Sequence, residues 1–335
     1  YGVRDIYGVQ YGMKGFYTYN WIQLKPSTVL KIHKTGGTIL GTSRGGFDVS
    51  KIMANVTKNN INQVYVVGGD GTLKASLELQ KYVSRKGLRV SIMNLPKTID
   101  NDIPIIDRSF GFQTSVDKAV EAINGAECEA VCAEYGIGMV KLMGRHTGHI
   151  ALEASLSHQG VDVLLIPESE YELEGPDGLL MFVYTQLLKK HHLVAVVAEG
   201  AEDSLKDANL KNTNRGVDAS GNKILFDICG YLKEQIINFC KSKGVEVTLK
   251  FIDPSYIIRS CPPNAFDSKL CVDIASHSVH GAMAGYTGFS SGVVNGQMVY
   301  IPLSEISFRS NRVDLNGKRW RQYLISSGQP SFINA

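Results

Sequence analysis

The sequence predicts an α/β protein with two lobes, in which largely parallel sheets are flanked by helices. Short runs of β-branched residues alternate along the chain with amphipathic helical stretches, which is typical of parallel sheets. The chain of 335 residues also exceeds the ~250–300 residues at which a single hydrophobic core stops growing. Two packed lobes are therefore expected.

Two short strands open the predicted series, and each leads into a polar segment. Residues 64–67 (VYVV) form a buried strand that runs into 68–72 (GGDGT), and the helical pattern that follows has Gly87 as its stop. Residues 90–95 form the next strand, followed by 96–102 (PKTIDND). The later elements, in chain order, are a helix over 114–135, a strand over 137–142, a turn over 143–148, a helix over 151–158, strands over 161–166 and 193–197 that end in Pro167-Glu168 and Glu199-Gly200, a helix over 227–243, a strand over 246–251, a helix over 267–284 and a hairpin at Asn295-Gly296.

Composition narrows the class of protein. Hydrophobic residues make up 44% of the chain and charged residues 20%, and the net charge is +3 with both signs interspersed. This weak charge gives no reason to expect nucleic acid or a membrane as partner, and no stretch reaches the ~20 apolar residues needed to span a bilayer. The polar residues 202–222 are expected to form an exposed, mobile insertion.

The six cysteines carry no C-x-x-C spacing, and most lie inside apolar helical or strand patterns. Reduced thiols in a cytosol-like compartment are the expectation. A metal or redox pair at Cys128 and Cys132 is the alternative.

The GGDGT segment, between a strand and a helix, favours phosphate binding. Glycines let backbone N–H groups approach phosphate closely, and the following helix N-terminus favours negative charge. Asp70 in such a cradle would repel phosphate unless a cation lies between them, so it implies Mg²⁺. Alone, the segment also fits a plain glycine-rich turn, an NAD kinase or a lipid kinase.

A pair of carboxylates follows the next strand. Asp100 and Asp102 can take different roles, one accepting a proton from an attacking hydroxyl and the other holding the metal between phosphates. A structural turn rich in Asp and Asn is the alternative. The two segments are one βαβ step apart, so both are expected at the carboxyl edge of one sheet, where ligands of open parallel sheets bind.

Basic residues suit phosphoryl oxygens at two further places. Arg145 stands on a glycine-flanked turn that opens a helix, and its planar fork matches phosphate oxygens. Lys250, Tyr256 and Arg259 form a later cluster that would suit a phosphate monoester on the substrate. The alternatives are a surface ion pair for Arg145 and a solvated strand end for the later cluster. His146 and His149 are expected to be structural.

Together these residues resemble the phosphofructokinase family, and within it the plant-type ATP-dependent branch, from about residue 32 to residue 332. The resembling stretches are 36–46 (GGTILGTSRGG), 62–72 (NQVYVVGGDGT), 96–102, 140–145 (VKLMGR), 252–259 (IDPSYIIR) and 280–288 (HGAMAGYTG). The resemblance implies a kinase that transfers a phosphoryl group from ATP to fructose 6-phosphate in glycolysis, with Mg²⁺ as cofactor.

The resemblance also implies a role for each matching residue. Asp100 matches the general base that takes the proton of the sugar 1-hydroxyl. The other roles are as follows: Asp70 and Asp102 hold Mg²⁺; Arg44 and Arg145 stabilise the transferring phosphoryl group, with the hydroxyl of Thr98 beside it; Gly45, Gly69, Gly71 and Thr72 line the donor site; Met143, Gly144 and Glu199 contact the sugar; Tyr256 and Arg259 lie at the 6-phosphate; and Lys250 matches a residue that a neighbouring subunit supplies.

Two residues bear on the donor. In this family an acid at the position of Gly71 accompanies pyrophosphate use, because it crowds the α-phosphate of a nucleotide, so Gly71 favours ATP. Lys97 points toward pyrophosphate, although plant-type ATP-dependent members combine both features. ATP is the expected donor, and a pyrophosphate-dependent enzyme is the close alternative.

The remaining expectations concern the chain as a whole. Family members begin with a strand and a G-G-x-x-P-G-x-N loop, and no such loop occurs here. Its absence predicts a missing first strand and raises the alternative of a truncated, non-catalytic sugar-phosphate-binding subunit.

The expected lobes are 1–112 with 257–310 for the phosphoryl donor and 113–256 with 311–335 for fructose 6-phosphate. An allosteric homo-oligomer, possibly a tetramer, is expected in the cytoplasm, with a plastid as the other compartment.

Overall fold

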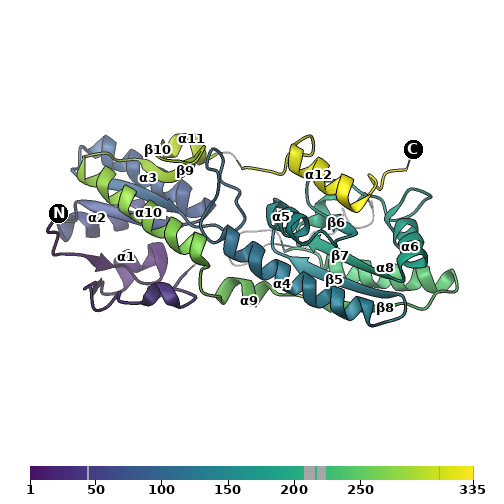
Figure 1. Cartoon of the computed structure of the whole chain (residues 1–335). Helices are drawn as coiled ribbons and strands as arrows, with labels where there is room; N and C mark the ends of the chain where they lie inside the picture. The colour runs from purple at the N-terminus through teal and green to yellow at the C-terminus, as the bar shows by residue number, and fades with distance from the viewer. Residues whose placement is uncertain (44, 207–215, 217–223, 309, 335) are drawn as a thin grey trace.

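Two four-stranded sheets lie in different halves of the elongated molecule (Figure 1). The computed structural model describes residues 1–43, 45–206, 216, 224–308 and 310–334. One sheet has the strand order β10-β9-β4-β3, and the other has the order β6-β7-β5-β8. Apart from the antiparallel β9–β10 pair, all neighbouring strands in these two sheets are parallel. The predicted α/β fold with largely parallel sheets is confirmed.

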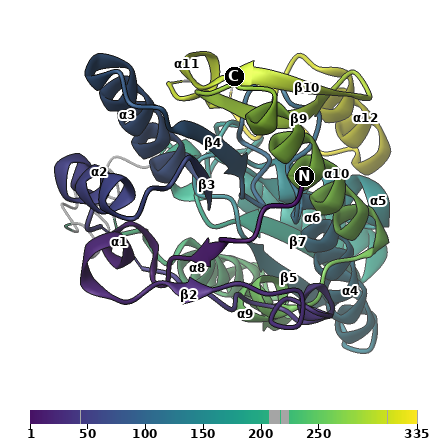
Figure 2. The ribbon, with the colours of Figure 1, turned by 90° about the vertical axis from the view of Figure 1, so that its left-hand side faces the viewer.

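The first sheet carries the glycine-rich segment. Its strands are β3 (Gln63–Gly68), β4 (Ser91–Pro96), β9 (Phe289–Val294) and β10 (Gln297–Pro302). Helices α2 (Val49–Lys58), α3 (Asp70–Lys86) and α10 (Ala265–Met283) pack against it, and the short α11 (Leu303–Ile306) follows β10 (Figure 2). Helix α3 ends at Gly87, whose φ of 61° lies in the left-handed region, as predicted.

Strands β5, β6 and β7 of the second sheet are buried, whereas its edge strand β8 is partly exposed. The strands of this sheet are β5 (Gly136–Leu142), β6 (Val163–Leu165), β7 (His192–Ala198) and β8 (Thr248–Ile252). Strand β5 lies at its centre, and nearly all residues of β5 and β7 are buried, as expected for parallel strands with helices on both faces. The surrounding helices are α4 (Phe112–Val131), α5 (His149–His158), α6 (Leu179–Lys190), α8 (Ile228–Ser242), α9 (Ser255–Ser260) and α12 (Lys318–Ser327).

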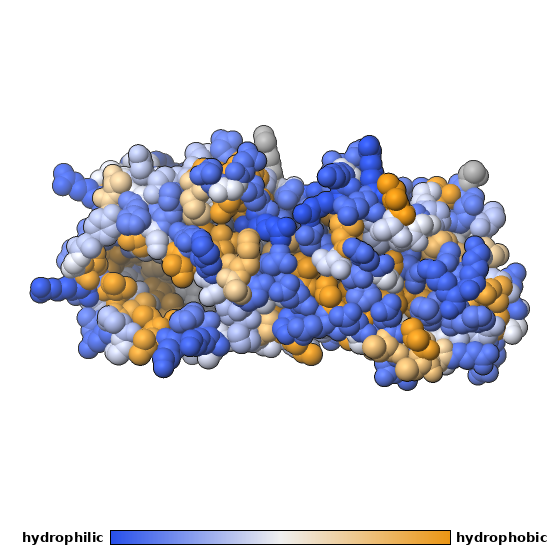
Figure 3. Space-filling model, viewed as in Figure 1, coloured by the Kyte–Doolittle hydropathy of each residue, from blue (hydrophilic) through white to orange (hydrophobic). Residues whose placement is uncertain are grey.

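The N-terminal residues form a small appendage beside the first sheet. It contains the antiparallel strands β1 (Tyr7–Gly8) and β2 (Ile22–Gln23) and the single-turn helix α1 (Gly15–Thr18). Figure 3 shows apolar side chains gathered in a hollow at this end of the molecule. The edge strand β3 exposes Tyr65 and Val67, and its Gln63 contacts Met283 at the end of α10.

Helix α4 receives its N-terminal cap from a distant helix. Its own N-cap residue is Gly111, which has no side chain to satisfy the first N–H groups. The buried carboxylate of Asp267 on α10 accepts hydrogen bonds from the backbone N–H of Thr114 (2.7 Å) and from its hydroxyl. A negative charge at a helix N-terminus is stabilising, so Asp267 both caps α4 and fastens it to α10.

Several predicted boundaries were wrong. Strand β6 covers only Val163–Leu165. Helix α4 ends at Val131 and not at Tyr135, because Tyr135 has a positive φ of 49° directly before β5. The residues around Tyr256 and Arg259 form helix α9 rather than a strand end. Most of the expected insertion over 202–222 lies outside the described residues, but its first part is packed: Ser204 and Leu205 are buried, and Leu205 pairs with Tyr171.

Candidate active site

The glycine-rich segment turns directly from β3 into α3. A Cβ on Gly68 would collide with the side chain of Thr72, so this close approach requires glycine. Asp70 begins the helix with an exposed carboxylate 2.9 Å from Lys74 Nζ. A Cβ on Gly71 would meet no atom within 4 Å, so space is open beside the helix N-terminus. The segment offers an anion a positive helix end and room to approach it.

The carboxylate loop follows β4 and lies beside this segment. The N–H of Lys97 donates to the carbonyl oxygen of Gly68 at 2.9 Å, which joins the two βα turns. The Thr98 hydroxyl accepts from the N–H of Asp100 and donates to Asp102 Oδ1, both at 3.1 Å. The predicted residues Thr98, Asp100 and Asp102 are therefore brought together, and the hydroxyl orders both acidic residues.

Asp100 is the residue on which charges from both halves of the molecule act. Burial raises its pKa from the ordinary carboxyl value to about 6, and the negative charges of Asp102 and Glu199 act in the same direction. The cations Arg259 and Lys97 lower the pKa, but by less. A carboxyl group that titrates near neutral pH is suited to accept a proton and release it again.

The turn after β5 faces the same region from the second sheet. Gly144 has a φ of 135°, and a Cβ there would collide with the carbonyl oxygen of Thr147. The N–H of Gly200 donates to Gly144 O at 3.1 Å, and the N–H of Glu199 donates to Leu142 O at 2.9 Å. A Cβ on Gly200 would collide with the carbonyl oxygen of Arg145. The backbone thus fixes Glu199 next to the turn that carries Arg145.

The later basic cluster divides between two elements. Arg259 on α9 donates from Nε to the sulfur of the buried Met143 at 3.0 Å, which places this helix against the same turn. Tyr256, on the same helix, is 86% exposed. Lys250 lies on the edge strand β8, where its Nζ is 3.5 Å from Glu129.

Four further positions were named from the sequence. Arg44 lies outside the described residues. Its neighbour Gly45 has a φ of 72° and open space around its Cβ position. Of the two histidines expected to be structural, His146 is exposed, whereas His149 is half-buried and contacts the carbonyl oxygen of Asn311.

The acidic side chains at this site suit a metal ion that substrate phosphates help to hold. In the parts of the chain that the structure describes, no group of three or more His, Cys, Asp or Glu side chains could hold a metal ion by itself. Mg²⁺ usually binds through one or two carboxylates together with substrate phosphates, so the oxygen donors of Asp70 and Asp102 fit that ion and not an all-protein cage. Over the same described residues, no helix is long and apolar enough to cross a membrane.

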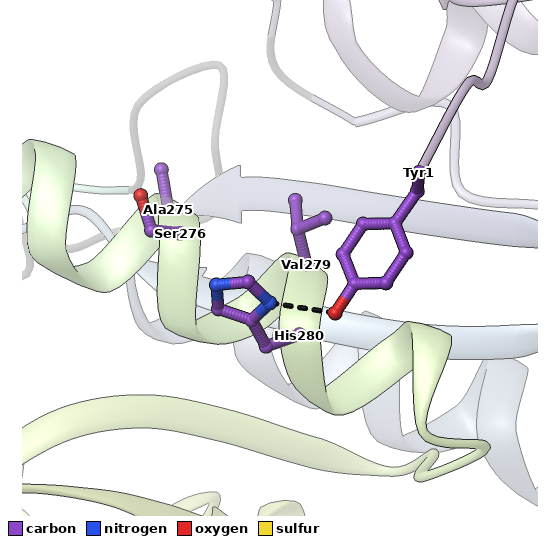
Figure 4. Close-up of a pocket in the computed structure, with 5 residues that line it drawn as sticks. All are labelled: Tyr1, Ala275, Ser276, Val279 and His280. Carbon is purple, nitrogen blue, oxygen red and sulfur yellow. Dashed lines mark hydrogen bonds between the residues drawn. The ribbon is translucent and has the colours of Figure 1, made fainter.

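A separate pocket of about 320 Å³ lies on the outer side of α10 (Figure 4). Tyr1, Ala275, Ser276, Val279 and His280 line it, and the hydroxyl of Tyr1 is 2.7 Å from His280 Nδ1. It contains no predicted site residue. The candidate active site is therefore defined by the carboxyl ends of the parallel strands and not by this pocket.

Two residues near the carboxylates had no role assigned from the sequence beyond a structural one. Asn311 contacts the carboxylate loop from 210 positions away in the chain, and it belongs to no motif. His149 stands next to a glycine-flanked arginine turn, which is the only sequence signal that it carries.

Comparison with known proteins identifies the family. The phosphofructokinase family model matches residues 1–282. ATP-dependent 6-phosphofructokinase 1 of Arabidopsis thaliana is 47% identical over 333 residues, which cover 99% of this chain and 70% of the relative. An ATP-dependent 6-phosphofructokinase of Borreliella burgdorferi is 42% identical over 98% of this chain and 75% of its own. The chloroplastic 6-phosphofructokinase 4 of A. thaliana is 46% identical, and this chain spans 63% of its length.

Solved structures give the same fold at lower identity. A pyrophosphate-dependent phosphofructokinase from Nitrosospira multiformis superimposes with a TM-score of 0.77 and 18% identity, over 96% of this chain and 83% of the other. Phosphofructokinase from Pichia pastoris superimposes with a TM-score of 0.73 and 21% identity, over 90% of this chain and 32% of the other. The family model, the relatives above 40% identity and the shared fold agree: this chain belongs to the phosphofructokinase family.

Proposed function

We propose that this protein transfers the terminal phosphoryl group of ATP to the 1-hydroxyl of fructose 6-phosphate, which gives fructose 1,6-bisphosphate in glycolysis. The observation that carries the proposal is the environment of Asp100. Its carboxyl group follows a strand of one sheet, and it responds to Glu199 and Arg259 from the other half of the molecule. A proton acceptor with a pKa of about 6 thus stands where a phosphoryl donor and a sugar could meet. The relatives named for this activity support it.

Asp100 acts in this proposal as the general base. It accepts the proton of the sugar 1-hydroxyl as the oxygen attacks the γ-phosphorus, and the bond from that phosphorus to the β,γ-bridging oxygen breaks. Near pH 7 most of the carboxyl group is ionised, because its pKa is about 6. Thr98 keeps Asp100 and Asp102 in a fixed relation.

Charge stabilisation supplies the other part of catalysis. Phosphoryl transfer requires positioning and neutralisation of charge more than covalent chemistry. Mg²⁺, held by Asp70 and Asp102 together with phosphate oxygens, would neutralise charge on the donor. Arg145 presents a guanidinium group from the second sheet, at a turn that Gly200 contacts closely.

The sugar phosphate is assigned to the second half of the molecule. Met143, Gly144 and Glu199 would contact the sugar, and Arg259 with Tyr256 would bind the 6-phosphate, since these residues border the turn after β5. The lobes predicted from the sequence, 113–256 with 311–335 for fructose 6-phosphate and 1–112 with 257–310 for the donor, meet inside α9. Because Ile258 of α9 is buried in the core of the second half, we propose that the whole of this helix, Arg259 included, belongs to the fructose 6-phosphate lobe.

Lys250 is proposed to serve the site of a second copy in a homo-oligomer. It lies on an edge strand, and within its own chain it pairs only loosely with the exposed Glu129. Sedimentation of the purified protein tests assembly, and full turnover by a monomer would exclude a shared site.

The proposed compartment is the cytoplasm; a plastid is the other candidate, because one relative is named chloroplastic.

The donor is proposed to be ATP. The open space at Gly71 supports a nucleotide, because an acidic side chain would fill the space beside the helix N-terminus. Pyrophosphate is the second candidate, favoured by the lysine at position 97. Formation of fructose 1,6-bisphosphate with each donor in parallel tests the proposal; no product with either donor would leave a non-catalytic sugar-phosphate-binding subunit as the explanation.

A further inference from the structure

Residues 311–313, which we call the strap, cross from the half of the molecule with α11 to the half with α12 (Figure 1). At one end, Asn311 makes three contacts. Its backbone N–H donates to the carbonyl oxygen of Asp102 at 2.7 Å, and its side-chain amide donates to the carbonyl oxygen of Asn101 at 3.2 Å. Its own carbonyl oxygen lies 3.3 Å from Nε2 of His149.

The strap is fastened to the second half at its other end. The N–H of Val313 donates to Oε1 of Glu168 at 2.9 Å, and the same carboxylate accepts the N–H of Gly148 at 3.1 Å. Val313 is also buried in the core cluster that contains Trp320. Glu168 therefore holds the strap and the start of α5 together.

His149 connects the strap to the arginine turn. It is the first residue of α5 and directly follows the turn that contains Arg145. Because a carbonyl oxygen can only accept, Nε2 of His149 must carry the proton in this contact. Burial lowers the pKa of His149, which favours the neutral imidazole. The histidine thus donates to the strap as a neutral group.

The carboxylate loop needs such support. Asn101, between the two acidic residues, has a φ of 56°, in the left-handed region that a residue with a side chain enters at a cost. Its side chain accepts the N–H of Ser109 at 2.8 Å, and Asn311 binds its carbonyl oxygen. Such a conformation persists where several contacts define it together.

We propose that Asn311 is a positioning residue for phosphoryl transfer: it fixes the backbone between Asp100 and Asp102 and, through His149, sets this loop relative to the turn of Arg145. This inference rests on the proposed function for its catalytic consequence. Its structural part, the ordering of the loop by the strap, stands on the contacts alone. A displacement of about 1 Å at reacting groups costs about 100-fold in rate, so small losses of support are measurable.

The test uses substitutions on both sides of the contact. Asn311→Ala removes the amide that binds Asn101 and keeps the two backbone contacts of the strap. His149→Leu removes the donor to Asn311, whereas His149→Gln keeps an N–H donor at a similar distance from the backbone. Asn316→Ala is the matched control, because Asn316 is exposed, lies in the same connection between α11 and α12, and makes its hydrogen bond to Asp314 through its backbone N–H.

We expect Asn311→Ala and His149→Leu to lower kcat about 10- to 100-fold, with the KM for ATP changed less than about twofold. His149→Gln should recover most of the loss, and Asn316→Ala should match the unsubstituted protein. Hydrogen exchange at the amides of Asp100 and Ser109 should be faster in the first two variants, with exchange in β5 and β7 unchanged.

Unchanged kcat and unchanged exchange in Asn311→Ala would overturn the proposal, and so would equal losses in His149→Leu and His149→Gln. If the unsubstituted protein itself makes no fructose 1,6-bisphosphate, the proposed function fails separately. The exchange measurement then decides the structural part: faster exchange of the loop supports it, and unchanged exchange refutes it.

Discussion

Asp100 and Glu199 follow strands of different sheets, yet the negative charge of Glu199 acts on the carboxyl group of Asp100. Burial is the larger cause of the raised pKa of Asp100, and the charges of Asp102 and Glu199 add to it. The protein thus maintains an acid close to two other acids, where ionisation is unfavourable. Acidic groups whose pKa is raised by burial and by neighbouring acids are concentrated at functional sites, where catalysis requires them.

Substitution of the proposed base should separate activity from stability. Asp100→Asn should lower kcat by about 10²- to 10⁴-fold, the usual contribution of general base catalysis. The folded-state pKa of about 6 is above the unfolded value, so ionisation of Asp100 opposes folding at high pH. The variant should therefore be more stable than the unsubstituted protein at pH 8, on the order of 2 kcal/mol.

Thermal unfolding measured at pH 8 and pH 4 checks this expectation. The gain in unfolding temperature should shrink as the pH falls from 6 toward 4, because the carboxyl group is then protonated in the folded state and is becoming protonated in the unfolded state as well. A variant that is less stable at pH 8 would show that Asp100 is held by favourable contacts instead.

The pH profile should respond to the neighbours of Asp100. In the unsubstituted protein, kcat/KM for fructose 6-phosphate should fall below about pH 6, where Asp100 becomes protonated. Glu199→Gln removes a negative charge and should move this midpoint to lower pH, whatever it does to the maximum rate. Arg259→Gln removes a positive charge and should move it to higher pH. Identical midpoints in all three proteins would mean that another group controls the acid limb.

An acidic side chain in place of Gly71 should impair the use of the phosphoryl donor and leave the fold unchanged. A Cβ at this position meets no atom within 4 Å, so Gly71→Asp should fold normally. Its charge would stand at the helix N-terminus beside Asp70, and we expect the kcat/KM for ATP to fall at least about 10-fold by charge repulsion and crowding. Gly71→Ala is the control and should keep most activity. If Gly71→Asp and Gly71→Ala use ATP equally well, Gly71 gives no support for ATP as the donor.

Loss of the cap on α4 should destabilise the protein. Asp267→Ala leaves the N–H of Thr114 without its acceptor, and it should cost about 2–3 kcal/mol. Asp267→Asn keeps an acceptor without the charge and should cost less. Asp273→Asn on the same helix breaks only a surface pair with Lys269 and should change stability by less than about 0.5 kcal/mol. Denaturant unfolding of the three variants compares them, and equal costs for Asp267 and Asp273 would refute the capping role.

The sequence predicted the parts of the site that depend on neighbouring residues. The GGDGT and PKTIDND segments follow short strands in a βα pattern, and their glycines and acids act within a few positions of each other. The hairpin at Asn295-Gly296 likewise needs only local geometry, with both residues at positive φ. These features were found where the sequence placed them.

Contacts between distant segments were not predictable in this way. Asn311 and Asn101 are 210 positions apart, and no periodic pattern links them. Asp267 caps α4 from 153 positions away. Helix α6 is apolar on several faces, and α9 has only six residues, so neither has the one-sided pattern that marks an amphipathic helix.

The most direct test of the proposed function is product formation by the purified chain with fructose 6-phosphate and Mg²⁺, offered ATP or pyrophosphate in parallel. We predict fructose 1,6-bisphosphate with ATP, little with pyrophosphate, and a loss of about 10²-fold or more in Asp100→Asn. Turnover with pyrophosphate and not with ATP would contradict the assignment of the donor. Turnover of Asp100→Asn at the unsubstituted rate would contradict the assignment of the base.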